Sequence, residues 1–545
     1  MAIMKKFIHH SLKQLIKPNL TSTKRVVSTS PRKEQGVAAI SLEPSEMAQC
    51  PFRKSIDTFT ETTNAVKAPG MTEVQPFERI PGPKGLPIVG TLFDYFKKDG
   101  PKFSKMFEVY RQRALEFGNI YYEKVGHFHC VVISSPGEYS RLVHAERQYP
   151  NRREMVPIAY YRKQKGFDLG VVNSQGEEWY RQRTVVSKKM LKLAEVSNFS
   201  TQMGEVSDDF VKRLSHVRDS HGEIPALERE LFKWAMESIG TFLFEERIGC
   251  LGQETSPMAQ TFIANLEGFF KTLQPLMYNL PTYKLWSTKL WKQFENYSDN
   301  VIDIGRSLVE KKWHPCKMEV TQNLHLISYL VNNGSMSTKE VTGLIVDLML
   351  AAVETTSSAT VWCLYNLAKN PQVQEKLFQE ITEAQAKNNG TISAEDLCKL
   401  PMVKAVVKET LRLYPITYST SRNIAEDMEL GGYTIPAGTH VQANLYGMYR
   451  DPSLFPEPEG ILPERWLRMN GSQMDATIKS TSQLVWGHGA RMCLGRRIAE
   501  QEMHITLSKI IQNFTLSYNH DDVEPILNTM LTPDRPVRIE FKPRQ

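Results

Sequence analysis

Apolar residues recur at helical spacing along most of the chain. The clearest helix pattern begins at Ser337, which has capping-box spacing with Glu340, and continues to Asn370, where Pro371 ends it. Its middle, residues 344–353, is apolar on every face, which is typical of a helix buried inside a protein. The pattern therefore predicts a core helix of about 32 residues, roughly 48 Å long.

Patterns typical of strands are short and few. They fall near residues 121–124, 130–133, 433–435 and 441–445. Residues 34–76 are polar and irregular, which predicts a linker, and a turn-rich segment begins at Pro81. From there to the C-terminus we find no internal repeat and no further linker pattern. The sequence thus predicts one large domain over residues 77–545, mainly α with small β-sheets.

Charge changes the picture at the N-terminus. The chain of 545 residues has a formal net charge of +7, from 67 basic and 60 acidic residues. Residues 1–33 carry eight basic residues and no acidic one, so the remainder has a net charge of −1. Without a basic excess on the predicted domain, nothing supports nucleic-acid binding.

The same N-terminal segment is amphipathic. Apolar residues from Met4 to Ile16 recur at helical spacing with lysines between them, and Ser and Thr follow Pro18. This composition is typical of a mitochondrial transit peptide, which we predict over residues 1–33 with cleavage between residues 33 and 50. A disordered basic tail and a membrane-surface helix stay open as alternatives. No apolar run reaches the ~18–20 residues of a membrane span, which leaves only peripheral attachment open.

Seven cysteines are too few for a disulfide scaffold, and no pair has C-x-x-C spacing. One of them, Cys493, lies in the glycine-rich segment 486–497, just before a helix-like stretch from Ile498. Glycines allow another body to approach the backbone closely. A helix N-terminus together with Arg491 favours a thiolate. The segment therefore predicts a thiolate that is either a nucleophile or a single metal ligand.

This segment resembles the haem-binding loop of the cytochrome P450 family, whose pattern is F-x-x-G-x-R-x-C-x-G. Gly489, Arg491, Cys493 and Gly495 match the pattern, whereas Trp486 stands where the family usually has Phe. The resemblance implies that these residues bind haem b (iron protoporphyrin IX), with the Cys493 thiolate as axial iron ligand and Arg491 at a propionate. It also implies the family's fold, in which haem lies between a long distal helix and this proximal loop.

Two helical pairs also match the family in order. Glu409 and Arg412 match E-x-x-R, a spacing that alone indicates an ordinary ion pair on a helix. In the family this pair joins an Arg from a P-E-R segment, here Arg465, and braces the haem loop, so the resemblance implies a structural role. Trp179 and Arg183 match W-x-x-x-R, which alone indicates a surface helix. The resemblance implies that both donate to haem propionates.

The resemblance assigns two further groups. Arg422, after Pro415, is similar in position to another propionate partner. Residues 351–356 resemble the family's A-G-x-(D/E)-T-(T/S) on the distal helix, with Ala352 in place of Gly. A Thr in a helix can bond back to a carbonyl one turn earlier and bend the helix. The family also uses the acid and the Thr for proton delivery during oxygen activation, which implies that role for Glu354 and Thr355.

Basic residues near the predicted proximal side indicate an electron donor. Lys404 and Lys408 lie four residues apart on the helix of Glu409, and Arg496 and Arg497 follow the haem cysteine. An ordinary solvated face is the alternative. The arrangement resembles the mitochondrial branch of the family, which implies a two-iron ferredoxin reduced by an NADPH-dependent ferredoxin reductase, on the matrix side of the inner membrane. A basic patch attracts such an acidic partner.

The substrate is less specified by the sequence. Residues 262–294 are rich in aromatic residues, which favours helix core, but the family's substrate roof and peripheral membrane contact fall here. Residues 416–420 and 527–531 fall where the family lines its pocket, and they mix apolar and hydroxyl side chains. We therefore expect an enzyme that inserts one atom of O2 into an apolar, sterol- or steroid-like substrate.

Several alternatives remain open from the sequence alone. A monooxygenase of xenobiotics or fatty acids fits nearly as well. A haem-thiolate isomerase would need neither O2 nor a redox partner, and the acid–Thr pair and the lysines argue against it. A haem-binding sensor would lack catalysis. A cysteine hydrolase pairing Cys493 with His488 has no oriented base and no third member.

Overall fold

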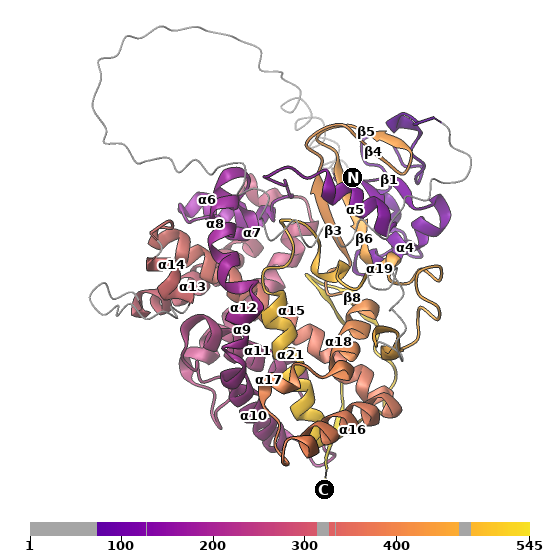
Figure 1. Cartoon of the computed structure of the whole chain (residues 1–545). Helices are drawn as coiled ribbons and strands as arrows, with labels where there is room; N and C mark the ends of the chain where they lie inside the picture. Colours follow the sequence, from indigo (N-terminus) through magenta and orange to yellow (C-terminus); the bar gives the residue numbers. More distant parts are fainter. Residues whose placement is uncertain (1–72, 127, 313–325, 333, 468–480, 545) are drawn as a thin grey trace, which may run out of the picture. The chain divides into compact units, whose positions relative to one another are not determined.

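The computed structural model describes residues 73–126, 128–312, 326–332, 334–467 and 481–544, all within one compact unit, Pro51–Gln545. The predicted transit peptide and nearly all of the predicted linker fall in residues 1–72, outside the described residues. Helices dominate the described part of the chain, with small sheets beside them (Figure 1). The predicted class, mainly α with small β-sheets, is confirmed.

The longer helices have these bounds: α4 (Met106–Phe117), α5 (Pro136–His144), α6 (Val156–Lys165), α8 (Gly176–Met190), α10 (Ser200–Val217), α11 (Leu227–Phe244), α12 (Pro257–Tyr278), α13 (Lys289–Lys312), α15 (Thr338–Lys369), α16 (Pro371–Lys387), α18 (Pro401–Leu413) and α21 (Arg496–Asn513). Short helices connect them: α7 (Gly170–Asn173), α9 (Leu193–Ser197), α14 (Leu326–Asn332), α17 (Ala394–Leu397) and α19 (Leu445–Met448). Single 3-10 turns are η1 (Phe77–Arg79), η2 (Leu92–Phe96), η3 (Phe103–Lys105), η4 (Thr282–Lys284), η5 (Pro463–Trp466) and η6 (Leu484–Trp486).

Helix α15 is the long core helix that the sequence predicts. The Ser337 side chain accepts from the Glu340 backbone N–H, and the Glu340 carboxylate accepts from the Ser337 backbone N–H, so the capping box is complete. The helix ends at Lys369 before the cap residue Asn370, as predicted. It is apolar and long enough to cross a membrane, but 72% of its apolar window is buried inside the protein, which is the pattern of a core helix.

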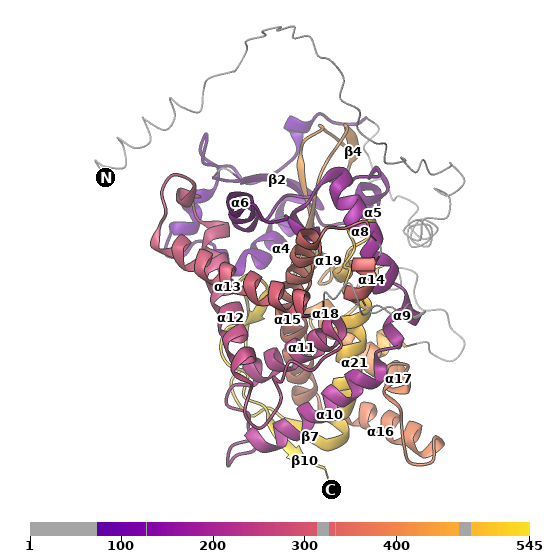
Figure 2. The same cartoon turned by 90° about the vertical axis from the view of Figure 1, so that its left-hand side faces the viewer.

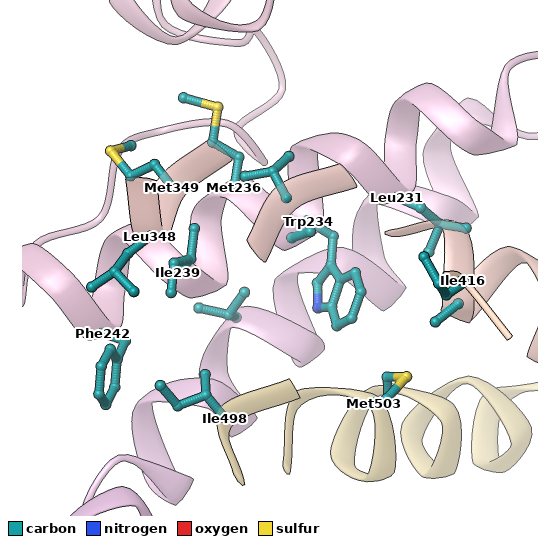
Figure 3. Close-up of a cluster of buried hydrophobic side chains, with 14 of the residues drawn as sticks. Leu231, Trp234, Met236, Ile239, Phe242, Leu348, Met349, Ile416, Ile498 and Met503 are labelled. Carbon is teal, nitrogen blue, oxygen red and sulfur yellow. The ribbon is translucent and has the colours of Figure 1, made fainter. Parts of the chain in front are cut away.

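The core forms where α15 packs against α11 and α21. Figure 3 shows their side chains gathered into one cluster, and Figure 2 shows α15 running through the helical part of the molecule. The cluster has fully buried Trp234 and Met236 from α11, Met349 from α15 and Met503 from α21. Burying large apolar side chains in this way is the main favourable term in folding. It fixes α15 and α21 on opposite walls of the site described below.

The strands form one four-stranded sheet and three two-stranded pairs. The sheet has the order β1-β2-β6-β3, in which β2 and β6 are parallel and the other pairs antiparallel. The bounds are β1 (Ile120–Val125), β2 (Phe128–Ile133), β3 (Ser419–Asn423), β4 (Met428–Leu430), β5 (Tyr433–Ile435), β6 (His440–Asn444), β7 (Phe514–Ser517), β8 (Pro525–Leu527), β9 (Leu531–Pro533) and β10 (Glu540–Pro543). The four predicted strands are confirmed as β1, β2, β5 and β6.

Candidate active site

The loop that carries Cys493 joins η6 to α21 and folds back on itself. The Cys493 backbone N–H donates to the Trp486 carbonyl over 2.7 Å. Gly489 has φ of +73°, and a Cβ there would lie 2.7 Å from Val143 and from the Glu146 carboxylate. Only glycine fits such a position. The loop therefore holds Cys493 at the N-terminus of α21, as the sequence predicts.

Protein groups alone do not favour the Cys493 thiolate. Burial raises the pKa of the Cys493 thiol above its usual value, although the Gly495 backbone N–H, Arg183 and Arg496 all work against this. Arg491, which the sequence suggested as the activating charge, instead stacks on the Trp179 ring at 3.8 Å. The helix N-terminus and nearby cations thus act in the direction that the sequence predicts, while burial acts against them. A bound metal cation is what deprotonates such a thiol outright.

A cavity separates this loop from α15. Its lining includes Cys493, Trp486 and Gly495 on one side and Ala351, Ala352, Thr355 and Thr356 of α15 on the other. The substrate-side wall contains Ile416, Thr417, Ser419 and Thr420, together with Leu348 and Leu445. The predicted pocket segment 416–420 thus lies at the cavity, whereas no residue of the other predicted segment, 527–531, is among those that line it. The site places a cysteine and a distal helix on opposite faces of one apolar space with a few hydroxyl groups.

Guanidinium groups gather beside Cys493. Arg152, Arg183 and Arg491 line the cavity, with Trp179 between them. Arg491 donates to the carbonyl oxygens of Pro150 and Ser174 and to the Gln175 side chain. Burial and repulsion among these cations lower the pKa of Arg491 to about 9. None of these three guanidinium groups forms an ion pair with a carboxylate of the described residues that line the cavity.

Two other predicted cofactor residues lie differently. Arg422 is on β3 behind the loop, where it is ion-paired with Glu146 and donates to the His488 carbonyl. It holds the loop from outside and is not among the residues that line the cavity. Gly489 also lies off the cavity, against Glu146 and Val143. The structure therefore supports both residues as parts of the loop's support, and their contact with a propionate stays a prediction.

The brace predicted from Glu409, Arg412 and Arg465 is assembled. Arg412 donates to both carboxylate oxygens of Glu409 over 2.9 and 3.0 Å, and Arg465 Nε donates over 3.1 Å. Arg412 also donates to the carbonyl oxygens of Tyr449, Pro458 and Gly460. Both Glu409 and Arg412 are fully buried. Trp466 adds a donor that the sequence did not indicate, because its indole N–H bonds the second Glu409 oxygen at 2.8 Å.

On α15, Thr355 and Glu354 face different surroundings. The Thr355 hydroxyl donates to the Ala351 carbonyl over 2.6 Å, the back-bond that the sequence predicts. The Glu354 carboxyl turns toward the β8–β9 hairpin, where the Thr529 hydroxyl donates to Oε1 over 2.8 Å. Burial raises the pKa of Glu354 to about 7, and the Thr529 hydrogen bond opposes that rise. A carboxyl near this pKa can both hold and release a proton at neutral pH.

The predicted basic surface is only partly free. Lys404 and Lys408 are half-buried on α18, and the Lys408 ammonium lies 5.9 Å from the Trp466 ring centroid. Arg496 is mostly buried and ion-paired with Glu500 at 3.0 Å, whereas the Arg497 side chain is 39% exposed and pairs with the same carboxylate at 3.6 Å. The structure brings Lys404, Lys408 and Arg497 to the surface and directs Arg496 inward.

The comparisons with known proteins agree with this geometry. The family model of cytochrome P450 matches residues 80–541. The chain belongs to the cytochrome P450 family. It is 31% identical to a mitochondrial 1,25-dihydroxyvitamin D(3) 24-hydroxylase of Rattus norvegicus over 522 residues, covering 95% of this chain and 96% of that protein.

Two further relatives are similar in extent. A mitochondrial cholesterol side-chain cleavage enzyme of Oncorhynchus mykiss is 32% identical over 491 residues, 88% of this chain and 93% of that protein. A mitochondrial sterol 26-hydroxylase of Mus musculus is 31% identical over 509 residues, 90% and 94% respectively. The predicted resemblance to mitochondrial cytochromes P450, the fold and the monooxygenase class are confirmed.

The residues around the cavity fit the haem-thiolate cofactor that this family implies. Cys493 lines the cavity from the loop between η6 and α21, and a cysteine thiolate is a group that can bind haem iron. Arg183 Nε is buried and has no hydrogen-bond partner among the described residues, and burial lowers the pKa of Arg183 to about 10. Two anionic propionates would satisfy such donors and balance the guanidinium cluster. The donor set therefore matches the acidic edge of a haem.

Sequence reasoning missed three residues at the site. Arg152 lines the cavity together with Arg183. In the sequence it is adjacent to Arg153, and nothing in the pattern indicates which of these two arginines faces the cavity. Trp466 follows the P-E-R segment in the sequence, but nothing there indicates that its indole N–H donates to Glu409. Thr529 lies 175 residues from Glu354, and no local pattern links them.

Proposed function

We propose that this cytochrome P450 is a mitochondrial monooxygenase that inserts one oxygen atom of O2 into a sterol-like substrate. The cofactor is haem b, with Cys493 as its iron ligand. The carrying observation is the single cavity that joins Cys493 to Thr355 of α15 and to the mixed wall Ile416–Thr420. The named substrates of the three relatives, a vitamin D derivative, cholesterol and a sterol, support the substrate class.

The chain's own residues would divide the work as follows. When bound, haem supplies the activation of dioxygen, in which two electrons and two protons accompany transfer of one atom to substrate and release of the other as water. Arg152, Arg183 and Arg491 hold the propionates, and Trp179 packs beneath Arg491. Thr355 bonds back to the Ala351 carbonyl where α15 lines the cavity, and Glu354 beside it would supply protons. Apolar wall residues orient substrate and exclude water.

The proposed electron donor is a two-iron ferredoxin, reduced by an NADPH-dependent ferredoxin reductase. Lys404, Lys408 and Arg497 form a basic surface that suits an acidic protein. Charge reversal as Lys404→Glu with Lys408→Glu is expected to raise the apparent KM for ferredoxin at least tenfold, without changing haem content. The control is the same reversal on α10 and α13, Lys212→Glu with Lys311→Glu. Equal KM values in the two double variants would contradict the assignment.

The proposed location is the matrix side of the inner membrane, with peripheral attachment. Support comes from exposed apolar side chains around η4, between α12 and α13: Met277, Tyr278, Leu280, Leu285 and Trp286. Their exposed area beside Lys284 suits an interface between lipid and water. Replacing Leu285 and Trp286 by Ser is expected to reduce co-flotation with vesicles that contain anionic lipid.

The deciding experiment is spectroscopic and catalytic. Reduced protein with carbon monoxide is expected to give the red-shifted Soret band of thiolate-ligated haem, and Cys493→Ala to lose it while Cys398→Ala keeps it. Sterols, steroids, fatty acids and xenobiotics are then compared for a spin-state shift and for ferredoxin-supported, NADPH-dependent product formation. Rearrangement of a peroxide into its own isomer, without NADPH or O2, would indicate an isomerase instead. Tight binding of fatty acids alone would overturn the sterol assignment.

A further inference from the structure

The tip of the β8–β9 hairpin touches α15 at Glu354, the residue before Thr355, which lines the cavity. The turn runs from Leu527 to Leu531 and closes with a hydrogen bond from the Asn528 backbone N–H to the Met530 carbonyl. Thr529 stands at its tip and donates to Glu354 Oε1 over 2.8 Å. The contact joins two segments that meet only in the folded protein.

The hairpin that presents Thr529 is held at two further points. The Leu531 backbone N–H donates to the Ile416 carbonyl over 2.9 Å, which ties the hairpin to the substrate-side wall. The Trp362 indole N–H donates to the Leu531 carbonyl over 3.1 Å, and Trp362 lies on α15 two turns after Glu354. Both hydrogen bonds are made by Leu531, two residues after Thr529, so they fix the side of the turn next to the hydroxyl group.

The carboxyl has little else to hold it. Glu354 Oε2 is buried and has no hydrogen-bond partner among the described residues. The charged or titratable groups that line the neighbouring cavity are Asp347, Glu502, Arg152, Arg183, Arg491 and Cys493. None of these forms an ion pair with Glu354, and on α15 Asp347 is paired with Arg162 at 2.7 Å. Burial and the Thr529 hydrogen bond are the influences on its pKa.

We propose that Thr529 is a positioning residue for Glu354, fixing which carboxyl oxygen carries the proton and coupling the acid to the substrate-side hairpin. Because the hydroxyl donates to Oε1, Oε2 is the oxygen left to carry the acid's proton. A substrate that moves Ile416 or the hairpin would then also move the acid. This inference rests on the proposed role of Glu354 in proton delivery.

The test compares three holoenzyme variants. Thr529→Val removes the hydroxyl, Thr529→Ser keeps it, and Thr532→Val removes a hydroxyl of the same hairpin that bonds Asn528 instead. The protonated Glu354 carboxyl is followed by its infrared C=O band between pH 5 and 9, assigned by its loss in Glu354→Gln. In parallel, hydrogen peroxide formed per NADPH is measured across the same pH range, since protons delivered late leave dioxygen reduced only to peroxide.

Thr529→Val is expected to move the carboxyl titration upward by about one pH unit, because a hydrogen bond to the charged form is lost. The pH dependence of the peroxide share is expected to move with it, while Thr529→Ser and Thr532→Val match the parent. Identical titrations in Thr529→Val and the parent, or the same shift in Thr532→Val, would overturn the proposal. If the titration shifts in Thr529→Val but Glu354→Gln forms the same share of peroxide as the parent, the Thr529–Glu354 contact is supported and the role of Glu354 in proton delivery is contradicted.

Discussion

Two buried carboxyl groups on neighbouring helices, Glu409 and Glu354, have opposite surroundings. Glu409 of α18 receives hydrogen bonds from the side chains of Arg412, Arg465 and Trp466 and from the Leu462 backbone N–H. Among the described residues, the carboxyl of Glu354 on α15 receives one hydrogen bond, from the neutral hydroxyl of Thr529. Both residues lie in helices that pack around the same cavity.

The difference separates a structural acid from a chemical one. Around Glu409 every carboxylate direction is occupied by a donor, two of them cationic, so the charge is compensated and the geometry is fixed. Around Glu354 the balance is set by burial, which brings its pKa to about 7. A carboxyl is useful for proton transfer only where its surroundings leave it incompletely paired. The extent of pairing, more than burial itself, therefore distinguishes the two roles.

The largest effect is expected from breaking the complete network. Glu409→Gln removes the charge that compensates Arg412 and Arg465, and an uncompensated buried cation costs about 3–5 kcal/mol. We expect loss of most soluble holoprotein, measured as the thiolate–carbon monoxide band per total protein. Glu383→Gln, on the exposed face of α16, is the matched control and should behave as the parent. Normal haem content in Glu409→Gln would mean that the network is not needed for the fold.

The same substitution at the incompletely paired Glu354 is expected to change catalysis without changing stability. Glu354→Gln keeps the shape and can still accept from Thr529, so the unfolding midpoint should stay within the error of the parent. Loss of a positioned acid typically costs about 100-fold or more in rate. We expect coupled product formation to fall by that order while NADPH oxidation continues and yields peroxide. If Glu354→Gln formed as much product as the parent, Glu354 would be a structural residue like Glu409.

The contrast was only half visible in the sequence. Glu409 with Arg412, and the two ends of α15, follow from local spacing and capping residues, so both could be predicted. Thr529 could not, because its role depends on a hairpin that returns from far along the chain. Strands β3, β4, β7, β8, β9 and β10 were missed for the same reason, since short strands are stabilised by partners rather than by their own residues. The completeness of a polar network is likewise a property of the folded chain.

A smaller effect sharpens the description of the complete network. Trp466→Phe keeps the ring that packs near Phe455 but removes the indole N–H from the second Glu409 oxygen. One missing donor to a buried carboxylate should cost about 1–3 kcal/mol, less than loss of the whole charge. We expect a lower urea midpoint with retained haem. A change as large as that of Glu409→Gln would instead make Trp466 indispensable to the brace.

A third buried acid tests whether incomplete hydrogen bonding is enough for a carboxyl group to take part in proton delivery. Glu502 of α21 is 2% exposed, its Oε1 has no partner among the described residues, and burial raises its pKa to about 8. Because the folded pKa lies above the unfolded value, the folded state retains a proton that the unfolded state releases. Stability should therefore fall as pH rises from about 4.5 to about 8, by at most about 1.4 kcal/mol per pH unit.

Glu502→Gln is expected to flatten this part of the pH–stability curve, raising the unfolding midpoint at pH 8 and leaving it nearly unchanged at pH 5. Its product-to-peroxide ratio should match the parent at every pH, in contrast to Glu354→Gln, because Glu502 lies on α21 and not beside Thr355 on α15. A change in that ratio would show that any poorly paired acid on the cavity wall can supply protons, and position on α15 would lose its special meaning.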